Sequence, residues 1–275
     1  MAAKNLESTL IVFQNPEEGC REAFDDWYTN IHIRDAMRLD TAIATQRFIE
    51  AEEQLEFDGK RVVPTHWAHT IYEWTDAAKC LQDHLDRVCT PLMEVSRDGR
   101  LTDLREYFGR AAFMSHGWSE EQGFRRGTGI MTAMIKLDAV KQRDFVKWFR
   151  EKHAPAVLAS PGFESAALFE LHEVQVLPPE FQVFAHYGLN DRHAALGAWR
   201  AAYKTGSNVD LASQCEFAEV TCWQPRTPRL RPQDVSNPSP EAAAEEARAR
   251  IQRKDRFLTR KQLAELEFGD ENALS

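Results

Sequence analysis

The chain carries one nine-residue pattern twice, as FDDWYTNIH at residues 24–32 and as FVKWFREKH at residues 145–153. The two stretches share a phenylalanine, a tryptophan, a second aromatic residue and a final histidine at a constant offset of 121 residues. The same offset aligns Phe48 with Phe169. Matches that keep this register indicate that one structural unit is duplicated along the chain.

The register of the repeat changes once, inside the first copy. Asp76 aligns with Asp191 at an offset of 115 residues, so the first copy has six extra residues within 53–65. This stretch contains Asp58-Gly59 and Pro64, which predict a longer hairpin loop. Each of the two aspartates follows a strand-like run and is expected to open a helix.

Hydrophobic periodicity predicts the same order of elements in both copies, strand–helix–strand–strand–helix–strand. In the first copy we expect strands at 9–14, 42–51, 66–74 and 105–114, with helices at 21–37 and 76–88. In the second copy we expect strands at 129–136, 163–174, 181–189 and 214–224, with helices at 143–158 and 191–203. A four-stranded sheet with helices on one face leaves its other face bare. We therefore expect two ferredoxin-like units packed sheet to sheet within one polypeptide.

The repeated pattern F-x-x-W-[YF]-x-x-x-H, followed by a turn and a strand, resembles the dimeric α+β barrel superfamily, and most closely its EthD-like members. The corner made by His153-Ala154-Pro155 and Ser160-Pro161-Gly162-Phe163 is similar to the helix-to-strand corner of that family. The resemblance covers about residues 8–224 and implies an α+β barrel formed by both units. Related barrels include isomerases, cyclases, dehydratases, cofactor-free monooxygenases and haem enzymes, so it does not imply one reaction.

The chain divides into four predicted regions. Residues 1–115 form the first unit, 116–127 a linker, 128–224 the second unit, and 225–275 a proline-rich segment followed by a helical arm. The apolar residues of the arm are sparse, and they are Ile251, Phe257, Leu258, Leu263, Leu266 and Phe268. This spacing favours a solvated helix or an arm that holds two copies of the chain together as a homo-oligomer. We expect the barrel to fold without it.

Composition excludes several classes of protein. The 275 residues carry a net charge of −9, which argues against nucleic acid as a partner. An apolar run long enough for a transmembrane helix is missing, and the first ten residues lack the pattern of a secretory signal. The five cysteines form no CxxC pair and fit reduced thiols. A cytoplasmic protein with no membrane partner is predicted.

The two units differ around the repeated histidine. Three polar residues of the first unit have apolar counterparts in the second, since Tyr28, Asp35 and Arg47 align with Phe149, Ala156 and Leu168. His32 is a candidate general acid or base because imidazole titrates near neutral pH. Asp35 lies three residues on and could orient its ring. The structural alternatives are a helix-capping role for His32 and a surface ion pair between Asp35 and Arg47.

The third strand of the first unit, 65–74, adds a second histidine. Alternation places Trp67 and His69 on one face of the sheet and His66 and Tyr72 on the other, so the two histidines cannot serve one site. In related barrels the ligand pocket lies between sheet and helices, which the resemblance extends to this chain. We predict His69 as a second proton carrier. The residues expected to bind substrate are Trp27, Tyr28, Arg47, Trp67 and Tyr72.

Signatures of other chemistries are missing from the sequence, among them HExxH, a Walker loop, GxGxxG after a strand and GxSxG. No metal and no cofactor is therefore predicted, and haem, which the resemblance permits, has no local support. Proton transfer remains the simplest chemistry. The sequence predicts a cofactor-independent lyase or isomerase acting on a hydrophobic, aromatic or polycyclic small molecule. The alternatives are a cofactor-free monooxygenase and a non-catalytic ligand-binding module.

Overall fold

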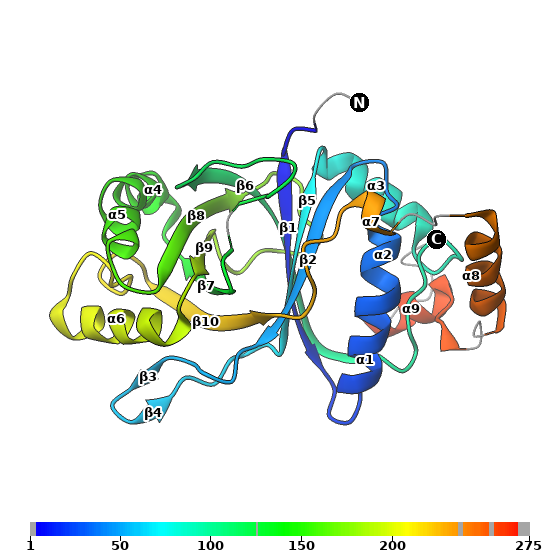
Figure 1. Cartoon of the computed structure of the whole chain (residues 1–275), viewed down its shortest axis with the longest axis horizontal. Coiled ribbons are helices and arrows are strands. Elements are labelled where there is room, and N and C mark those ends of the chain that lie inside the picture. The colour runs from blue at the N-terminus through cyan, green and yellow to red at the C-terminus, as the bar shows by residue number, and fades with distance from the viewer. Residues whose placement is uncertain (1–3, 125, 236–238, 253–255, 269–275) are drawn as a thin grey trace.

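The structure is a computed structural model that describes residues 4–124, 126–235, 239–252 and 256–268 (Figure 1). The first unit contains, in order, β1 (Ser8–Pro16), α1 (Arg21–Trp27), the π-helical turn η1 (Tyr28–His32), α2 (Ile33–Ala36), β2 (Ala42–Glu50), β5 (Ala68–Trp74), α3 (Ala77–Arg87) and β6 (Leu101–Met114). The extra residues between β2 and β5 form the small hairpin β3 (Glu56–Phe57) and β4 (Lys60–Arg61).

The second unit repeats this order. It contains β7 (Gly129–Lys136), η2 (Ala139–Lys141), α4 (Gln142–Trp148), the π-helical turn η3 (Phe149–His153), α5 (Ala154–Leu158), β8 (Phe163–Leu171), β9 (Val183–Leu189), α6 (Arg192–Thr205) and β10 (Phe217–Pro225). The predicted strands and helices are all present, with bounds that differ by a few residues. Asp76 and Asp191 cap α3 and α6 by accepting hydrogen bonds from backbone amides, as expected.

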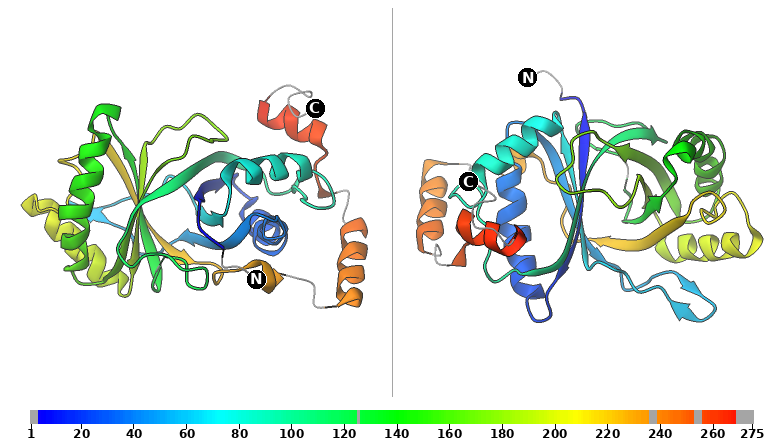
Figure 2. Two further views of the ribbon diagram at one scale, coloured as in Figure 1. Left: turned by 90° about the horizontal axis from the view of Figure 1, so that it is seen from above. Right: turned by 180° about the vertical axis from the view of Figure 1, so that it is seen from behind.

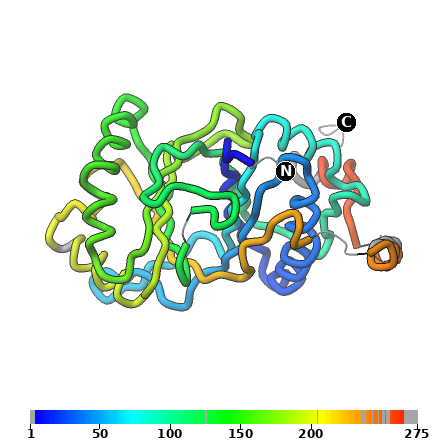
Figure 3. The backbone as a smooth tube through the Cα atoms, turned by 45° about the horizontal axis from the view of Figure 1, so that its top comes forward, coloured from blue at the N-terminus to red at the C-terminus, as the bar shows by residue number. Residues whose placement is uncertain are grey.

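The two sheets join at their edges and close into one barrel. The strand order is β1-β5-β2-β10-β7-β9-β8-β6, and the units meet where β2 pairs with β10 and β6 pairs with β8. Closure leaves neither sheet with a free edge strand. The tube in Figure 3 follows both halves around the common barrel. The predicted α+β fold, two ferredoxin-like units forming an intramolecular barrel, is confirmed.

The faces of the strands define two environments. The barrel interior is packed with aromatic side chains, among them Phe13, Phe48, Phe184 and Trp223. The helices cover the outside, with α1 and α3 on the first unit and α4, α5 and α6 on the second (Figures 1 and 2). A side chain of the first unit therefore points either into the barrel or toward α1 and α3.

One glycine shapes the predicted corner before β8. Gly162 has a φ of +87°, and a Cβ atom there would come within 2.3 Å of the carbonyl oxygen of Asp191. Only glycine fits this position without displacing the start of α6.

The segment predicted as a linker does more than connect the units. Phe124 is buried in the barrel interior, and Trp118 and Arg126 both donate to the carboxylate of Glu73. The segment therefore closes one end of the barrel.

The C-terminal region packs against the first unit of its own chain. It contains α7 (Pro232–Val235), α8 (Pro240–Gln252) and α9 (Arg260–Phe268), and α9 lies beside the helices of the first unit (Figure 1). The side chains of Ile251, Leu266 and Phe268 fall outside the described residues. Within the described part of the chain, each helix is too short or too polar to span a bilayer.

Candidate functional site

A cavity of about 420 Å³ lies between the sheet of the first unit and its helices. The strands contribute Leu10, Gln14, Tyr72, Trp74, Leu104, Glu106 and Phe108, and the helices contribute Phe24, Trp27, Tyr28, His32, Cys80, Leu81 and His84. This volume falls within the range of small-molecule sites. The wall is mostly aromatic and aliphatic, with a few polar groups, which suits a flat apolar ligand.

Helix α1 and the turn η1 present their aromatic residues and His32 to this cavity. The π-helical turn Tyr28–His32 places the His32 ring 4.7 Å from the Tyr28 ring and 5.0 Å from the Trp27 ring, measured between centroids. Such turns are frequent at functional sites. The indole nitrogen of Trp27 donates to the carbonyl oxygen of Glu94 at 2.9 Å, which fixes the indole at the cavity wall.

Two tyrosines form a hydrogen-bonded pair in the cavity. The hydroxyl of Tyr72 donates to the hydroxyl oxygen of Tyr28 at 2.8 Å. Burial raises the pKa of both phenols, so both stay protonated at neutral pH. Because Tyr28 accepts from Tyr72, its own proton can be donated to an acceptor in the cavity.

Arg47 lies behind Tyr28 and is fully buried. Its guanidinium carbon is 4.3 Å from the centroid of the Tyr28 ring, and it donates to Gln14 Oε1 at 3.0 Å and to Asp25 at 3.4 Å. The positive charge favours the phenolate of Tyr28 and thereby opposes part of the rise in its pKa. Arg47 therefore acts on the cavity through Tyr28 and Gln14, since it does not line the wall itself.

Two imidazoles face the cavity from different helices. His32 and His84 are both half-buried and line the cavity. Burial lowers the pKa of His32 to about 3 and that of His84 to about 4, so both are neutral at pH 7. Their ring centroids are 6.3 Å apart. The Nδ1 atom of His32 is buried and has no hydrogen-bond partner among the described residues.

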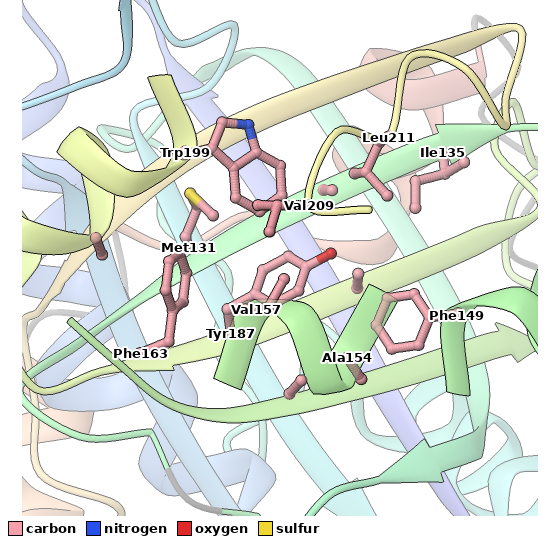
Figure 4. Close-up of a cluster of buried hydrophobic side chains, with 14 of the residues drawn as sticks. Met131, Ile135, Phe149, Ala154, Val157, Phe163, Tyr187, Trp199, Val209 and Leu211 are labelled. Carbon is pink, nitrogen blue, oxygen red and sulfur yellow. The ribbon is translucent and has the colours of Figure 1, made fainter. Parts of the chain in front are cut away.

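The second unit shows what this arrangement looks like when its hydrogen bonds are complete. His153 occupies the position of His32, and its ring nitrogens bond the Tyr187 hydroxyl and the Asn208 carbonyl oxygen, both at 2.8 Å. Trp199 packs over the same ring, with centroids 6.0 Å apart. Figure 4 shows Tyr187, Phe149 and Trp199 within one cluster of buried apolar side chains.

Several polar residues at the cavity have apolar counterparts in the second unit. The offsets of the repeat align Tyr28 with Phe149, Gln14 with Ile135, Arg47 with Leu168 and His84 with Trp199. Glu106 pairs with Val12 where β6 meets β1, and Val220 pairs with Ala133, the counterpart of Val12, where β10 meets β7. Glu106 and Val220 therefore occupy equivalent positions. Tyr72 and Tyr187 correspond as well, but Tyr72 bonds Tyr28 instead of the histidine. One polar cavity and one apolar core thus result from a single duplicated scaffold.

The predicted role of Asp35 is wrong. Its buried carboxylate accepts from Arg38 at 2.9 Å, and Arg38 also pairs with Glu246 of α8. No hydrogen bond joins Asp35 to His32 among the described residues. The three-residue spacing permitted the contact, but the neighbouring guanidinium offers a charge-assisted bond that a neutral imidazole cannot match.

The predicted proximity of His69 to the site of His32 is also wrong. The face of β5 that carries His69 points into the barrel, where its ring stacks on Phe13 at 4.5 Å and lies 5.4 Å from His186. Its Nδ1 atom is 3.0 Å from the carbonyl oxygen of Val12. Strand alternation was right about the two faces, but sequence could not tell which of them met the helices.

Of the remaining predicted site residues, some line the cavity and others lie outside its wall. Trp27, Tyr28, His32 and Tyr72 line the cavity, whereas Trp67 lies before β5 near Arg21 and Arg47 and does not. Gln14, His84 and Glu106 were missed. Comparing the repeats position by position would have revealed them, since each replaces an apolar residue of the second unit.

Among the described residues, no group of three or more histidine, cysteine, aspartate or glutamate side chains is placed to hold a metal ion.

No known protein-family model matches the sequence, and no curated protein matches it either. Solved structures do match. A structure described as an anthrone oxidase-like protein is 10% identical, with a TM-score of 0.57, over 84% of this chain and 95% of that chain. The likeness is one of fold.

Two further solved structures match more distantly. A chlorite dismutase from Candidatus Nitrospira defluvii is 10% identical, with a TM-score of 0.45, over 87% of this chain and 94% of that chain. A monooxygenase-like protein from Listeria innocua is 10% identical, with a TM-score of 0.38, over 81% and 94%. The barrel fold rests on the strand order of this chain and on the match with a TM-score of 0.57, and placement among EthD-like members stays a prediction.

Proposed function

We propose that the first unit is a cofactor-independent enzyme site that transfers a proton on a flat, hydrophobic small molecule bearing a ketone or phenol. The observation that carries this proposal is the difference between the two histidines. His153 has both ring nitrogens bonded in a filled core, whereas His32 lines a cavity and its buried Nδ1 has no hydrogen-bond partner among the described residues. A purely structural role would not require one unit to give up the bonds that the other makes.

The tyrosine pair suits a developing negative charge. Tyr72 donates to Tyr28, and Tyr28 can donate onward to a ligand oxygen, so the two bonds polarise each other. The guanidinium of Arg47 beside the Tyr28 ring makes this phenol a stronger donor. A preorganised donor in an apolar site stabilises an enolate or phenolate oxygen as it forms.

His32 is the proposed proton acceptor. Its neutral imidazole can take a proton from a carbon next to the ketone, whose electron pair then moves onto the oxygen held by Tyr28. The enolate formed beside the ring stabilises the imidazolium and raises its low pKa during the reaction. Returning the proton at another atom completes an isomerisation, and expelling a protonated leaving group completes an elimination. His84 lines the same cavity, and its neutral imidazole can accept a second proton.

A second candidate function is oxygenation without a cofactor, in which the enolate itself reacts with oxygen. It shares the first step and the same residues. The structure described as an anthrone oxidase-like protein has the same fold and suggests anthrone as the first compound to test.

The test is exchange of the acidic methylene protons of anthrone, followed by NMR in D₂O without oxygen. We expect the protein to accelerate exchange, and Tyr28→Phe and His84→Trp to reduce this acceleration ~10²-fold or more. Each variant installs the residue of the second unit. The matched control is Tyr107→Phe, which removes a buried phenol on the barrel side of the same unit.

Oxygen uptake in air, measured with an electrode, separates the two candidates. Exchange without oxygen uptake supports the lyase or isomerase, and uptake that depends on Tyr28 and His32 supports the oxygenase. Exchange that both variants leave at the wild-type rate would contradict the proposed site.

A further inference from the structure

The C-terminal segment contributes to the wall of the cavity. Leu258 and Leu263 both border it, although they follow the last barrel strand by more than thirty residues. Leu263 and its neighbour Ala264 are buried. A region expected to be dispensable for the barrel thus supplies apolar surface to the site.

The segment is attached by a short stretch of backbone pairing. Phe257 forms an antiparallel bridge with Ser96, the amide of Leu258 donates to the carbonyl oxygen of Val95 at 2.8 Å, and the amide of Arg97 donates to Arg256 at 2.8 Å. These contacts tie the segment to residues 95–97, which themselves border the cavity.

Side chains add two further attachments. Arg97 donates to the carbonyl oxygen of Phe257 at 2.8 Å and to Gln262 at 2.9 Å. Arg260 donates to the carbonyl oxygens of Leu85 and Val88 at the end of α3, at 2.7 and 3.2 Å. These last carbonyl groups of a helix have no partner within it, so a guanidinium is well suited to bind them.

These contacts differ in kind from those that hold the barrel. The segment forms no strand of the barrel, and its polar attachments are exposed or half-buried hydrogen bonds. Such contacts open locally at lower free energy than a packed core. Among the described side chains of the segment, Leu258 and Leu263 border the cavity, where an apolar ligand can contact them.

We propose that residues 256–268 form a lid over the cavity, in which Leu258 and Leu263 set the size of the apolar ligand and which lifts when the ligand enters. The inference rests on the cavity being the substrate site of the proposed function. It assigns a specificity role to two residues that lie far from the barrel in sequence.

The first experiment measures binding of N-phenyl-1-naphthylamine, a neutral apolar dye whose fluorescence rises in apolar surroundings. Leu258→Ala and Leu263→Ala should each speed dye dissociation about tenfold in stopped-flow measurements, since most affinity changes appear in the dissociation rate. Leu92→Ala is the matched control, because Leu92 is 61% exposed and does not border the cavity.

The second experiment holds the lid closed with an engineered disulfide. Bridge partners in antiparallel strands lie at Cα separations compatible with a disulfide, so Ser96→Cys combined with Phe257→Cys should crosslink on oxidation. Dye association should slow at least tenfold in the oxidised double variant and recover on reduction. Wild type and each single variant, treated with the same oxidant, control for the five native cysteines.

His84→Trp separates failure of the lid from failure of the site. Suppose that this variant loses dye binding while the leucine variants and the crosslink leave the rates of dye association and dissociation unchanged. The cavity is then supported as the binding site, and the lid is contradicted. If His84→Trp binds the dye like wild type, the dye occupies another place, and both the lid and the proposed site are contradicted.

Discussion

Tyr72 and Tyr187 occupy equivalent strand positions, and the partner of each hydroxyl determines what the nearby histidine can do. Tyr187 bonds His153, whereas Tyr72 bonds Tyr28 and leaves His32 facing a cavity. One hydroxyl group, present on Tyr28 and missing from Phe149, accounts for this difference.

Removing each histidine should therefore have opposite consequences. His153→Ala leaves the buried Tyr187 hydroxyl without its partner, and we expect it to cost about 1–3 kcal/mol of unfolding free energy. His32→Ala breaks no protein hydrogen bond in the described chain, so stability should change little while proton exchange slows ~10²–10⁴-fold.

Urea denaturation and anthrone exchange, measured on both variants, check this pair of expectations. Exchange abolished by His153→Ala in a protein that is still folded would place the chemistry in the second unit.

Residue-level prediction from sequence succeeded where the repeat supplied a comparison. Trp27, Tyr28 and His32 were found because their segment is repeated, and Tyr72 because it belongs to the group of aromatic residues in the first unit. Asp35 was misplaced because its partner Arg38 competes for it, and competition between side chains depends on rotamers that spacing does not specify. Glu106 and His84 also replace apolar residues of the second unit, but the prediction used the repeat only around residues 24–48, so it did not include them.

At the scale of elements, α3 and α6 are equivalent helices of the two units that present different side chains to their sheets. α6 inserts Trp199 over the second sheet, whereas α3 presents His84 to a cavity. The bounds of these helices followed from their aspartate caps and apolar periodicity. The cavity could not be predicted in the same way, because it depends on how completely side chains fill the space between helix and sheet and not on which residues are apolar.

Truncation of the two side chains should reveal this difference. Trp199→Ala empties a packed position and should cost about 3–5 kcal/mol. His84→Ala enlarges a cavity that already exists and should cost much less. Chemical denaturation of both variants measures the two values, and equal losses would mean that α3 is packed as tightly as α6.

The whole molecule is held at one end by a buried ionic cluster. Glu73 of the first unit bonds Arg126, which precedes the second unit, and Arg229 of the C-terminal region at 2.6 Å. Burial alone would raise the pKa of Glu73, but the two guanidinium groups outweigh it and hold that pKa below its ordinary value. The cluster thus joins three regions that are distant in sequence.

The lowered pKa makes this contribution dependent on pH. A carboxylate whose pKa is lower in the folded state stabilises it fully above the unfolded value of about 4.5 and loses this effect as pH falls through the folded value. Glu73→Gln should cost about 3–5 kcal/mol at pH 7, because two buried charges lose their partner. Its unfolding free energy should also fall less steeply below pH 4.5 than that of wild type. Denaturation curves between pH 3 and pH 7 test this, and parallel profiles would contradict it.

The barrel itself was predictable from the repeat, since two sheets with bare faces in one chain have few other ways to cover them. The position of the C-terminal segment was not, because its sparse apolar residues specify no unique partner surface.

The central claim is that the two units diverged into a ligand site and a core. A crystal structure of the protein soaked with anthrone tests it most directly. We predict density between β1, β5 and β6 and helices α1 and α3, with the ligand oxygen within hydrogen-bond distance of the Tyr28 hydroxyl. Density in the barrel interior beside His69, or in the second unit beside His153, would contradict the account.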